Sequence, residues 1–328
     1  MIITRTPFRV SFFGGGTDYA AWYAENSGSV LATTINKYCY ITCRYLPPFF
    51  GYKHRIVYSK REEVKTIDEI DHPSVRECMR FMKIDRGLEI HHDGDLPARS
   101  GLGSSSSFTV GFLHALYALK GQMVTKRQLA LDAIHVEQER IKENVGSQDQ
   151  TLAAFGGFNR IDFGGDHHIQ VQPITLEAER LDQLQDHLML CFTGFSRIAS
   201  EVTGEHIKKV SRNKKALRTM HQMVEEAINI LNSNRDIADF GKLLHESWLL
   251  KRGLTDKIST PQIDDIYSAA LGAGAIGGKL LGAGSGGFVL FFARPEQQAK
   301  IKESLNLLQA PFRFEDLGSQ VIFYQPKS

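Results

Sequence analysis

Residues 95–107 read Asp-Leu-Pro-Ala-Arg-Ser-Gly-Leu-Gly-Ser-Ser-Ser-Ser, and this stretch decides the fold. Gly101 and Gly103 have no side chain, so backbone N–H groups beside them can approach an anion closely. The serines stand where a helix is expected to begin, because apolar residues recur at helical spacing from Ser104 to Leu119. The positive end of a helix dipole binds phosphate readily. The stretch therefore predicts a phosphate-binding loop.

The loop differs from two common phosphate-binding signatures. No Gly-Lys-Ser or Gly-Lys-Thr follows the glycines, as a Walker loop requires. No third glycine completes a dinucleotide-binding fingerprint. Taken alone, the glycine and serine run is also compatible with a flexible turn that carries serine caps. The choice between a turn and a phosphate-binding loop therefore depends on other motifs in the chain.

The composition is that of a globular protein without a general attraction for polyanions. The 328 residues are 42% hydrophobic and 23% charged, and this length favours two domains. A formal net charge of +2 gives no broad field for nucleic acid or an anionic membrane. The four cysteines are too few for a disulfide scaffold, and no apolar stretch is long enough for a signal peptide or a membrane span. We therefore expect a cytoplasmic protein.

The expected elements are mixed rather than regularly alternating, which predicts an α+β fold. In the first half, strands are expected at 2–13, 29–45 and 55–59, helices at 104–119 and from 125 to about 144, and a hairpin around residues 164–165. A domain boundary is placed near residue 180. The second half is expected to contain strands at 188–192, 288–293 and 321–325, helices at 200–232, 236–251 and 262–273, and a glycine loop at 277–287.

Three further motifs stand in a fixed order around the phosphate loop. Residues 5–18 read Arg-Thr-Pro-Phe-Arg-Val-Ser-Phe-Phe-Gly-Gly-Gly-Thr-Asp, Glu137 lies twelve residues before Asp149, and residues 279–287 read Lys-Leu-Leu-Gly-Ala-Gly-Ser-Gly-Gly. With Pro-x-x-x-Gly-Leu-Gly-Ser-Ser, this order resembles the GHMP kinases, the superfamily of galactokinase, homoserine kinase, mevalonate kinase and phosphomevalonate kinase. The resemblance implies two domains, a half like domain 2 of ribosomal protein S5 at 1–180 and a ferredoxin-like half at 181–328.

The resemblance also implies ATP and Mg²⁺ as cofactors. The nucleotide is expected to bind loop residues Pro97, Gly101, Leu102, Gly103, Ser104, Ser105 and Ser106. Ser105 and Glu137 are implied as the magnesium ligands, since Mg²⁺ prefers oxygen. The alternative for Glu137 is a solvated position on a charged helix.

Phosphoryl transfer depends mostly on positioning and on neutralising charge. By resemblance, Asp149 is the base or orienting carboxylate for the acceptor hydroxyl, and Arg9 stabilises the developing charge. Whether Asp149 accepts the proton or mainly orients the hydroxyl stays open. The substrate-binding residues implied by the first and third motifs are Gly15, Gly16, Thr17, Asp18, Gly284 and Gly286.

The first motif also bears on the substrate. Galactokinases usually carry Gly-Glu-His-Thr-Asp, whereas residues 14–18 are Gly-Gly-Gly-Thr-Asp, which resembles bacterial D-glycero-D-manno-heptose 7-phosphate kinases. This resemblance implies phosphorylation at C1 of a small sugar phosphate, giving a heptose 1,7-bisphosphate for surface-polysaccharide precursors, and leaves a homodimer open as the assembly. Such a substrate needs a second anion site, for which the expected donors are Arg44, Lys53, His54, Arg55 and Arg197, with 47–54 as a lid.

Two other functions compete with this interpretation. One is a fucose- or arabinose-type sugar 1-kinase of the same superfamily, which substrate profiling would distinguish. The other is a sugar-binding regulator that keeps the fold without catalysis. Retention of Asp149, Glu137 and Ser105 argues against a regulator, because binding alone needs neither metal ligands nor a base.

Overall fold

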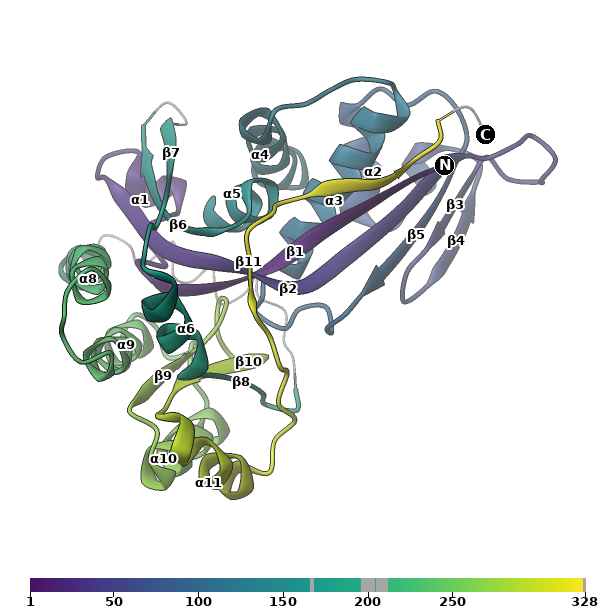
Figure 1. Ribbon diagram of the computed structural model, residues 1–328. Helices are drawn as coiled ribbons and strands as arrows, with labels where there is room; N and C mark the ends of the chain where they lie inside the picture. The colour runs from purple at the N-terminus through teal and green to yellow at the C-terminus, as the bar shows by residue number, and fades with distance from the viewer. Residues whose placement is uncertain (166–167, 196–203, 205–211, 327–328) are drawn as a thin grey trace.

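The protein is described by a computed structural model that covers residues 1–165, 168–195, 204 and 212–326 (Figure 1). The elements of its first half are β1 (Ile2–Phe13), α1 (Ala20–Tyr23), β2 (Gly28–Tyr45), β3 (His54–Val57), β4 (Arg61–Val64), η1 (Ile67–Glu69), α2 (Pro73–Phe81), β5 (Leu88–Gly94), α3 (Ser104–Leu119), α4 (Lys126–His135), η2 (Val136–Ile141), α5 (Gln148–Phe155), β6 (Phe158–Gly164) and β7 (His168–Pro173). Those of its second half are α6 (Ala178–Asp186), β8 (Leu188–Phe192), α8 (Lys214–Leu231), α9 (Ala238–Arg252), α10 (Pro261–Ala273), β9 (Gly277–Leu280), β10 (Phe288–Phe292), α11 (Pro295–Leu305), β11 (Phe314–Glu315) and β12 (Gln320–Tyr324).

The larger of two sheets is organised around the long strand β2. The main path of strands is β12-β1-β2-β5-β3-β4, and β6 pairs with the first part of β2 and with β7. All of these pairings are antiparallel except β3 with β5. The β1–β2 pairing shifts register between Pro7 and Phe8 and again between Ser11 and Phe13.

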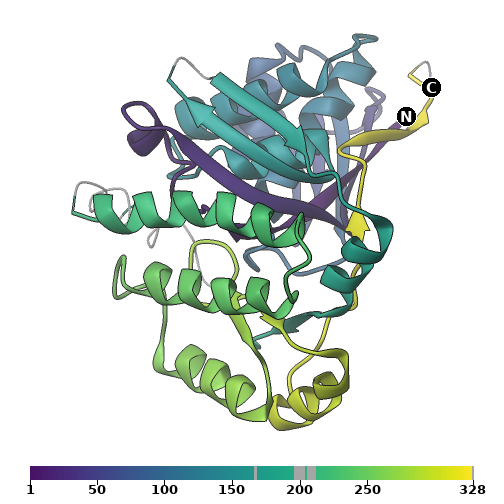
Figure 2. The same cartoon turned by 60° about the vertical axis from the view of Figure 1, so that its left-hand side comes forward.

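Helices cover the two faces of this sheet unequally. In Figure 1, α2, α3, α4 and α5 lie together on one face, and α3 is buried along most of its length. On the other face, α8 and α9 lie between the large sheet and the small one (Figure 2). The two halves of the chain are therefore joined by packed helices rather than by a linker.

The small sheet has the order β8-β10-β9 and carries α10 and α11 on its outer side. A single antiparallel bridge joins Cys191 of β8 to Gln309, which places the chain after α11 next to β8. The order of elements is thus strand, helices, two strands, helix and a final extended segment, as in ferredoxin-like folds. The predicted α+β fold with two domains is confirmed.

The last two strands, β11 and β12, belong to the large sheet of the first half. β12 pairs with β1, with Ile2 opposite Tyr324, and β11 pairs with β2. Figure 1 shows this C-terminal segment running back along the large sheet. A boundary near residue 180 assigned these residues to the second domain, whereas their backbone hydrogen bonds belong to the first sheet.

Several helix ends follow from local sequence. α3 spans the predicted 104–119. Thr125 caps α4 by accepting a hydrogen bond from the N–H of Gln128 at 3.1 Å, as expected. The helical segment is an α-helix to His135 and a π-helix from Val136 to Ile141. It ends three residues before the predicted end near residue 144, where Lys142 adopts a left-handed conformation. In the stretch predicted at 200–232, the described helix is α8; residues 200–203 and 205–211 lie outside the described part.

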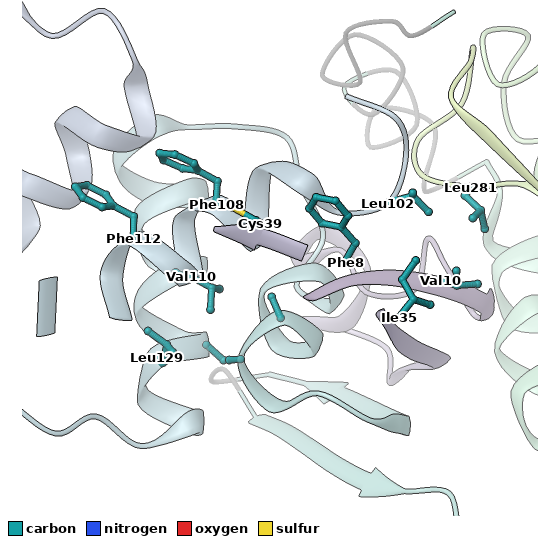
Figure 3. Close-up of a cluster of buried hydrophobic side chains, with 14 of the residues drawn as sticks. Phe8, Val10, Ile35, Cys39, Leu102, Phe108, Val110, Phe112, Leu129 and Leu281 are labelled. Carbon is teal, nitrogen blue, oxygen red and sulfur yellow. The ribbon is translucent and has the colours of Figure 1, made fainter. Parts of the chain in front are cut away.

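The main hydrophobic core continues from the first half into the second. Phe8 and Val10 of β1, Leu102 of the phosphate loop and Leu281 of the glycine loop belong to one buried cluster, and Figure 3 shows the latter two side by side. This contact joins the bases of the two loops. All four cysteines are buried and free, and none of the described helices is long and apolar enough to cross a bilayer.

Candidate active site

A cavity of about 280 Å³ lies where the two halves meet. One wall comes from the first half and includes the end of β1, the turn after it, the phosphate loop and the segment that leads into α5. The other wall comes from the end of α9, from β9 and from the glycine loop. We call these the first-half wall and the second-half wall.

Arg9 and Asp149 form the central pair of the first-half wall. The Nε and Nη2 groups of Arg9 donate to the two carboxylate oxygens of Asp149 at 2.7 and 2.8 Å. Arg9 is 5% exposed, whereas the Asp149 side chain is 24% exposed and faces the cavity. A bidentate pair of this kind fixes both groups, and it confirms that β1 and α5 bring the two predicted catalytic residues together.

The phosphate loop runs directly beside this pair. Gly103 caps α3 with a φ of +75°, and a Cβ there would lie 3.3 Å from Oδ2 of Asp149. The hydroxyl of Ser104 accepts a hydrogen bond from the N–H of Arg99 at 3.1 Å, which closes the loop. Ser104, Ser105 and Ser106 line the cavity. The N-terminus of a sixteen-residue helix therefore opens into the cavity within reach of Asp149.

The glycine loop of the second half touches the phosphate loop. A Cβ on Gly282, whose φ is +71°, would lie 2.5 Å from the Cα of Gly101. The N–H of Phe288 donates to the carbonyl of Ser100 at 3.0 Å. Arg9 also donates to the carbonyl of Gly101 at 2.5 Å, so both loops and the central pair form one connected unit.

Glu137 lies behind the serines and is fully buried. Its Oε2 accepts hydrogen bonds from Ser106 at 2.8 Å and from Gln150, while its Oε1 has no partner among the described residues. Burial raises the pKa of this carboxyl to about 7, with Glu143 adding to the rise and the hydrogen bonds from Ser106 and Gln150 opposing it. Glu137 is not a solvated helix position, contrary to the alternative considered above.

The donor set around Glu137 fits a magnesium ion. A buried carboxylate oxygen without a partner and a serine hydroxyl beside the cavity are oxygen ligands, and Mg²⁺ often takes one carboxylate together with phosphates and waters. The serine that contacts Glu137 is Ser106, whereas Ser105 is exposed and faces the cavity. The structure therefore brings Glu137 together with the serine after the one predicted.

The first motif forms a tight turn whose carboxylate faces the cavity. Oδ1 of Asp18 accepts from the N–H of Gly16 at 2.9 Å, and burial raises the pKa of Asp18. A Cβ on Gly146 would lie 1.9 Å from Oδ2 of Asp18, so a side chain at this position would displace that carboxylate. The hydroxyl of Thr17 donates to the carbonyls of Gly14 and Ser29 and holds the turn from behind.

Most predicted binding residues line the cavity, but three do not. Gly15, Gly16, Asp18, Gly284 and Gly286 line it together with the loop glycines and serines. Pro97, Leu102 and Thr17 are absent from its lining: Pro97 is exposed, Leu102 packs in the core, and Thr17 is buried in the turn.

Two lysines on the second-half wall were not predicted to act at the site. Lys251, in the last turn of α9, donates to the carbonyls of Leu280 at 3.0 Å and Gly282 at 2.6 Å. Lys279 of β9 is 3% exposed and donates to the carbonyl of Phe12 at 2.7 Å. Burial lowers the pKa of Lys251 to about 7 and that of Lys279 well below its usual value, and the charge of Arg9 contributes to both. A lysine that opens the glycine motif was a usable signal for Lys279, but Lys251 had none.

The cations expected to bind a second phosphate lie elsewhere. Arg44 and Arg55 both donate to Glu89, at 2.6 and 2.8 Å, and lower the pKa of that carboxyl to about 2 although burial opposes them. His54 is buried and accepts from the N–H of Leu88. Neither these three, nor Lys53, nor the segment 47–54 lines the cavity, because the end of β2 carries them away from it; Arg197 lies outside the described residues.

Comparison with known sequences gives matches over both halves. Residues 73–157 match the model of the GHMP kinases N terminal domain and residues 213–308 that of the GHMP kinases C terminal domain, together more than half of the chain. A D-glycero-alpha-D-manno-heptose 7-phosphate kinase of Campylobacter jejuni subsp. jejuni is 29% identical over 320 residues, which is 93% of each chain. A galactokinase of Thermotoga maritima is 25% identical over 339 residues, which is 92% of each chain.

Solved structures share the fold at lower identity. A D-glycero-D-manno-heptose 1-phosphate kinase from Bacteriodes thetaiotaomicron superimposes with a TM-score of 0.79 at 23% identity, covering 97% of this chain and 98% of the other. A Streptococcus pneumoniae phosphomevalonate kinase gives a TM-score of 0.75 at 16% identity, covering 96% and 100%. At these identities the likeness shows the fold alone.

Proposed function

This chain belongs to the GHMP kinase family, and as a sugar kinase of that family we propose that it transfers the γ-phosphoryl group of ATP to the C1 hydroxyl of D-glycero-D-manno-heptose 7-phosphate. The similarity to the Campylobacter jejuni heptose 7-phosphate kinase over 93% of both chains supports the choice of sugar. Gly15 and Gly16, which stand where galactokinases usually carry Glu and His, support it independently.

One observation carries the reaction type. The Arg9–Asp149 pair faces the same cavity as the N-terminus of α3, and Gly103 allows the two to approach closely. An acceptor hydroxyl next to Asp149 would then lie beside phosphates bound by the loop. Transfer of a phosphoryl group needs this juxtaposition more than it needs covalent chemistry from the protein.

The proposed transfer exchanges one oxygen–phosphorus bond for another. The acceptor oxygen forms a bond to the γ-phosphorus, the bond from that phosphorus to the β,γ-bridging oxygen breaks, and ADP leaves. Asp149 orients the hydroxyl and accepts its proton, which it later returns to water. Arg9 fixes Asp149 and offsets the charge that develops on the acceptor oxygen.

The remaining groups bind and orient. Asp18 accepts a sugar hydroxyl, held in place by Gly16 and the close approach of Gly146. Ser106 and Glu137 would hold Mg²⁺, which neutralises charge on the nucleotide phosphates when bound. The glycine loop, through Gly282 and its contact with Gly101, keeps water out of the transfer region.

The test is ADP release with Mg-ATP against heptose 7-phosphate, mannose, fucose and galactose. We expect turnover with the heptose 7-phosphate and at least ~100-fold lower kcat/KM with the free sugars, since a buried phosphate site would be left empty. Turnover confined to a free sugar would replace the proposed substrate and keep the kinase. Absence of turnover with all four would contradict the proposal.

A further inference from the structure

The second-half wall of the cavity carries two basic side chains and no acidic one among its described residues. Lys251 and Lys279 both line the cavity, and every other lining residue of this wall is apolar or glycine. We call these two residues the lysine pair. Neither makes an ion pair with a carboxylate in the described part of the chain, and their hydrogen bonds go to main-chain carbonyls.

Two carboxylates of the opposite wall are already engaged. Asp149 accepts two hydrogen bonds from Arg9, so that pair is electrically balanced. Asp18 accepts from the N–H of Gly16, and burial favours its protonated form. Glu143 also lines this wall, and burial raises its pKa. The charges of Asp18 and Asp149 oppose the fall that burial causes in the pKa of Lys251, although neither forms an ion pair with the lysine pair in the described part of the chain.

Burial lowers the pKa of both lysines, whereas an anion beside them would favour their ammonium forms. As an ammonium group, Lys251 has three N–H donors and uses two of them on Leu280 and Gly282, which leaves one for a ligand in the cavity that the residue lines. The bonds to the loop carbonyls hold the ammonium in a fixed position. A polar group so fixed is suited to bind a ligand rather than to sit in solvent.

We propose that Lys251 and Lys279 form a phosphate subsite on the second-half wall, separate from the serine loop. This inference rests on the proposed function only in that it takes the cavity as the place where phosphorylated substrates bind. The phosphate has two sources in that reaction, the γ-phosphate of ATP and the phosphate of the sugar substrate. If the phosphate is that of the sugar, the subsite is the second anion site for which Arg44, Lys53, His54 and Arg55 were expected.

A binding experiment separates the sources without requiring turnover. The variants are Lys251→Met, which keeps the length of the side chain, and Lys251→Arg, which keeps the charge. Lys242→Met is the matched control, because Lys242 is an exposed lysine on the same helix and its side chain is 65% exposed. Calorimetry would measure the affinity of each variant for inorganic phosphate, for ADP and for a non-hydrolysable ATP analogue. Melting temperature and circular dichroism would show that each variant is folded.

We expect Lys251→Met to weaken the binding of inorganic phosphate about 10-fold or more. Lys251→Arg should restore much of that affinity, and Lys242→Met should leave it unchanged. If the subsite takes the γ-phosphate, the same variant weakens the ATP analogue and not ADP. If it takes the phosphate of the sugar, both nucleotides bind normally, while KM for the sugar phosphate rises about 10-fold.

Two outcomes would overturn the subsite. One is unchanged binding of phosphate and both nucleotides with unchanged KM values in folded Lys251→Met protein. The other is a uniform loss of all ligands that follows a fall in melting temperature and appears equally in Lys251→Arg, since this would show that Lys251 only holds the loop. If the wild-type protein phosphorylates none of the sugars, the proposed function fails, but the arms with phosphate and nucleotides still decide about the lysine pair.

Discussion

The two walls of the cavity are chemically opposite. The first-half wall contributes the carboxylates Asp18, Glu143 and Asp149, with Glu137 behind its serines, and balances Asp149 with Arg9. The second-half wall contributes Lys251 and Lys279 and no carboxylate among its described residues. Hydrogen bonds between its own side chains preorganise the first wall, whereas the two lysines of the second wall bond only to main-chain carbonyls. The difference indicates that residues of the first half activate the acceptor hydroxyl, whereas residues of both halves neutralise the charge of the phosphates.

The largest effect should come from the first wall, at Asp149. Asp149→Asn keeps the size of the side chain but removes the proton acceptor, so we expect kcat to fall by about 10³-fold while ADP affinity stays within about 3-fold. Steady-state kinetics and calorimetry would measure the two. Asp162→Asn is the control, because Asp162 is also paired with an arginine but lies on β6, away from the cavity. Near-full activity of Asp149→Asn would remove the acceptor role from this wall.

A smaller effect is expected at the buried carboxylate that contacts Ser106. Glu137→Gln should raise the Mg²⁺ concentration for half-maximal activity by about 10-fold or more, because a charged oxygen ligand is lost. A magnesium titration of the initial rate would measure this. The exposed neighbour Glu139 provides the control as Glu139→Gln. An unchanged titration in the first variant would place the ion elsewhere.

The same carboxylate predicts a dependence of stability on pH. In the folded protein the pKa of Glu137 is about 7, against 4.5 for an exposed glutamate, so between these pH values the folded state binds more protons than the unfolded one. Its contribution is present below about pH 4.5 and is lost as the pH rises through about 7. Without Mg²⁺, the melting temperature of the wild type should therefore fall between pH 5.5 and 8 more than that of Glu137→Gln. Parallel curves for the two proteins would contradict this.

A single added methyl group on Gly282 should disrupt the contact between the glycine loop and the phosphate loop. In Gly282→Ala the new Cβ would meet the Cα of Gly101 at 2.5 Å and would strain a φ of +71°. We expect the loops to separate and KM for ATP to rise about 5-fold, with a modest loss of stability. Gly272→Ala on α10 has no atom within 4 Å of its new Cβ and should instead stabilise the helix by up to about 1 kcal/mol. Equal KM values in the two variants would show that the walls act independently.

The smallest effect should come from cations outside the cavity. Arg44→Ala removes one partner of Glu89 at the far end of β2, so we expect KM for the sugar phosphate to stay within about 2-fold and stability to fall by about 1 kcal/mol or less. Kinetics and denaturant titration would measure both. A 10-fold rise in KM would restore the second anion site that Arg44 and Arg55 were first expected to form.

Most residues that the motifs predicted for the first wall do line one cavity, because each motif has a local signature. A glycine pair before serines and a helical apolar pattern predicted a loop that ends at a helix N-terminus, and the Glu137–Asp149 spacing predicted two groups that both lie beside this loop. The pairing of Glu137 with Ser106 depends on which way successive serines point at the start of α3, and spacing along the chain does not give that. β5 and the return of β12 were missed as partners of β2 and β1 because strand pairing is set by distant residues.

The second wall was harder because its key residue has no local signature. Lys251 ends an amphipathic helix, where a basic residue is ordinary and usually solvated. Only the tertiary contact of α9 with β9 turns its ammonium toward Leu280 and Gly282. Likewise, the sequence does not show that Arg44 and Arg55 are already paired with a carboxylate. The pairing of β2 and β3 with β5 brings both arginines to Glu89, to which they donate hydrogen bonds.

The pairing of β12 with β1 has a consequence for synthesis. Arg5 and Gln320 are hydrogen-bonded across a separation of 315 residues, so one edge of β1 lacks its partner until nearly all of the described chain has been made. At about 5–20 residues per second, the delay is roughly 15–60 s. During that interval an apolar strand edge is exposed to the nascent chains of neighbouring ribosomes, which is the condition under which strands pair with the wrong partner. We expect the yield of correctly folded protein in a cell to depend on how that edge is protected while translation proceeds.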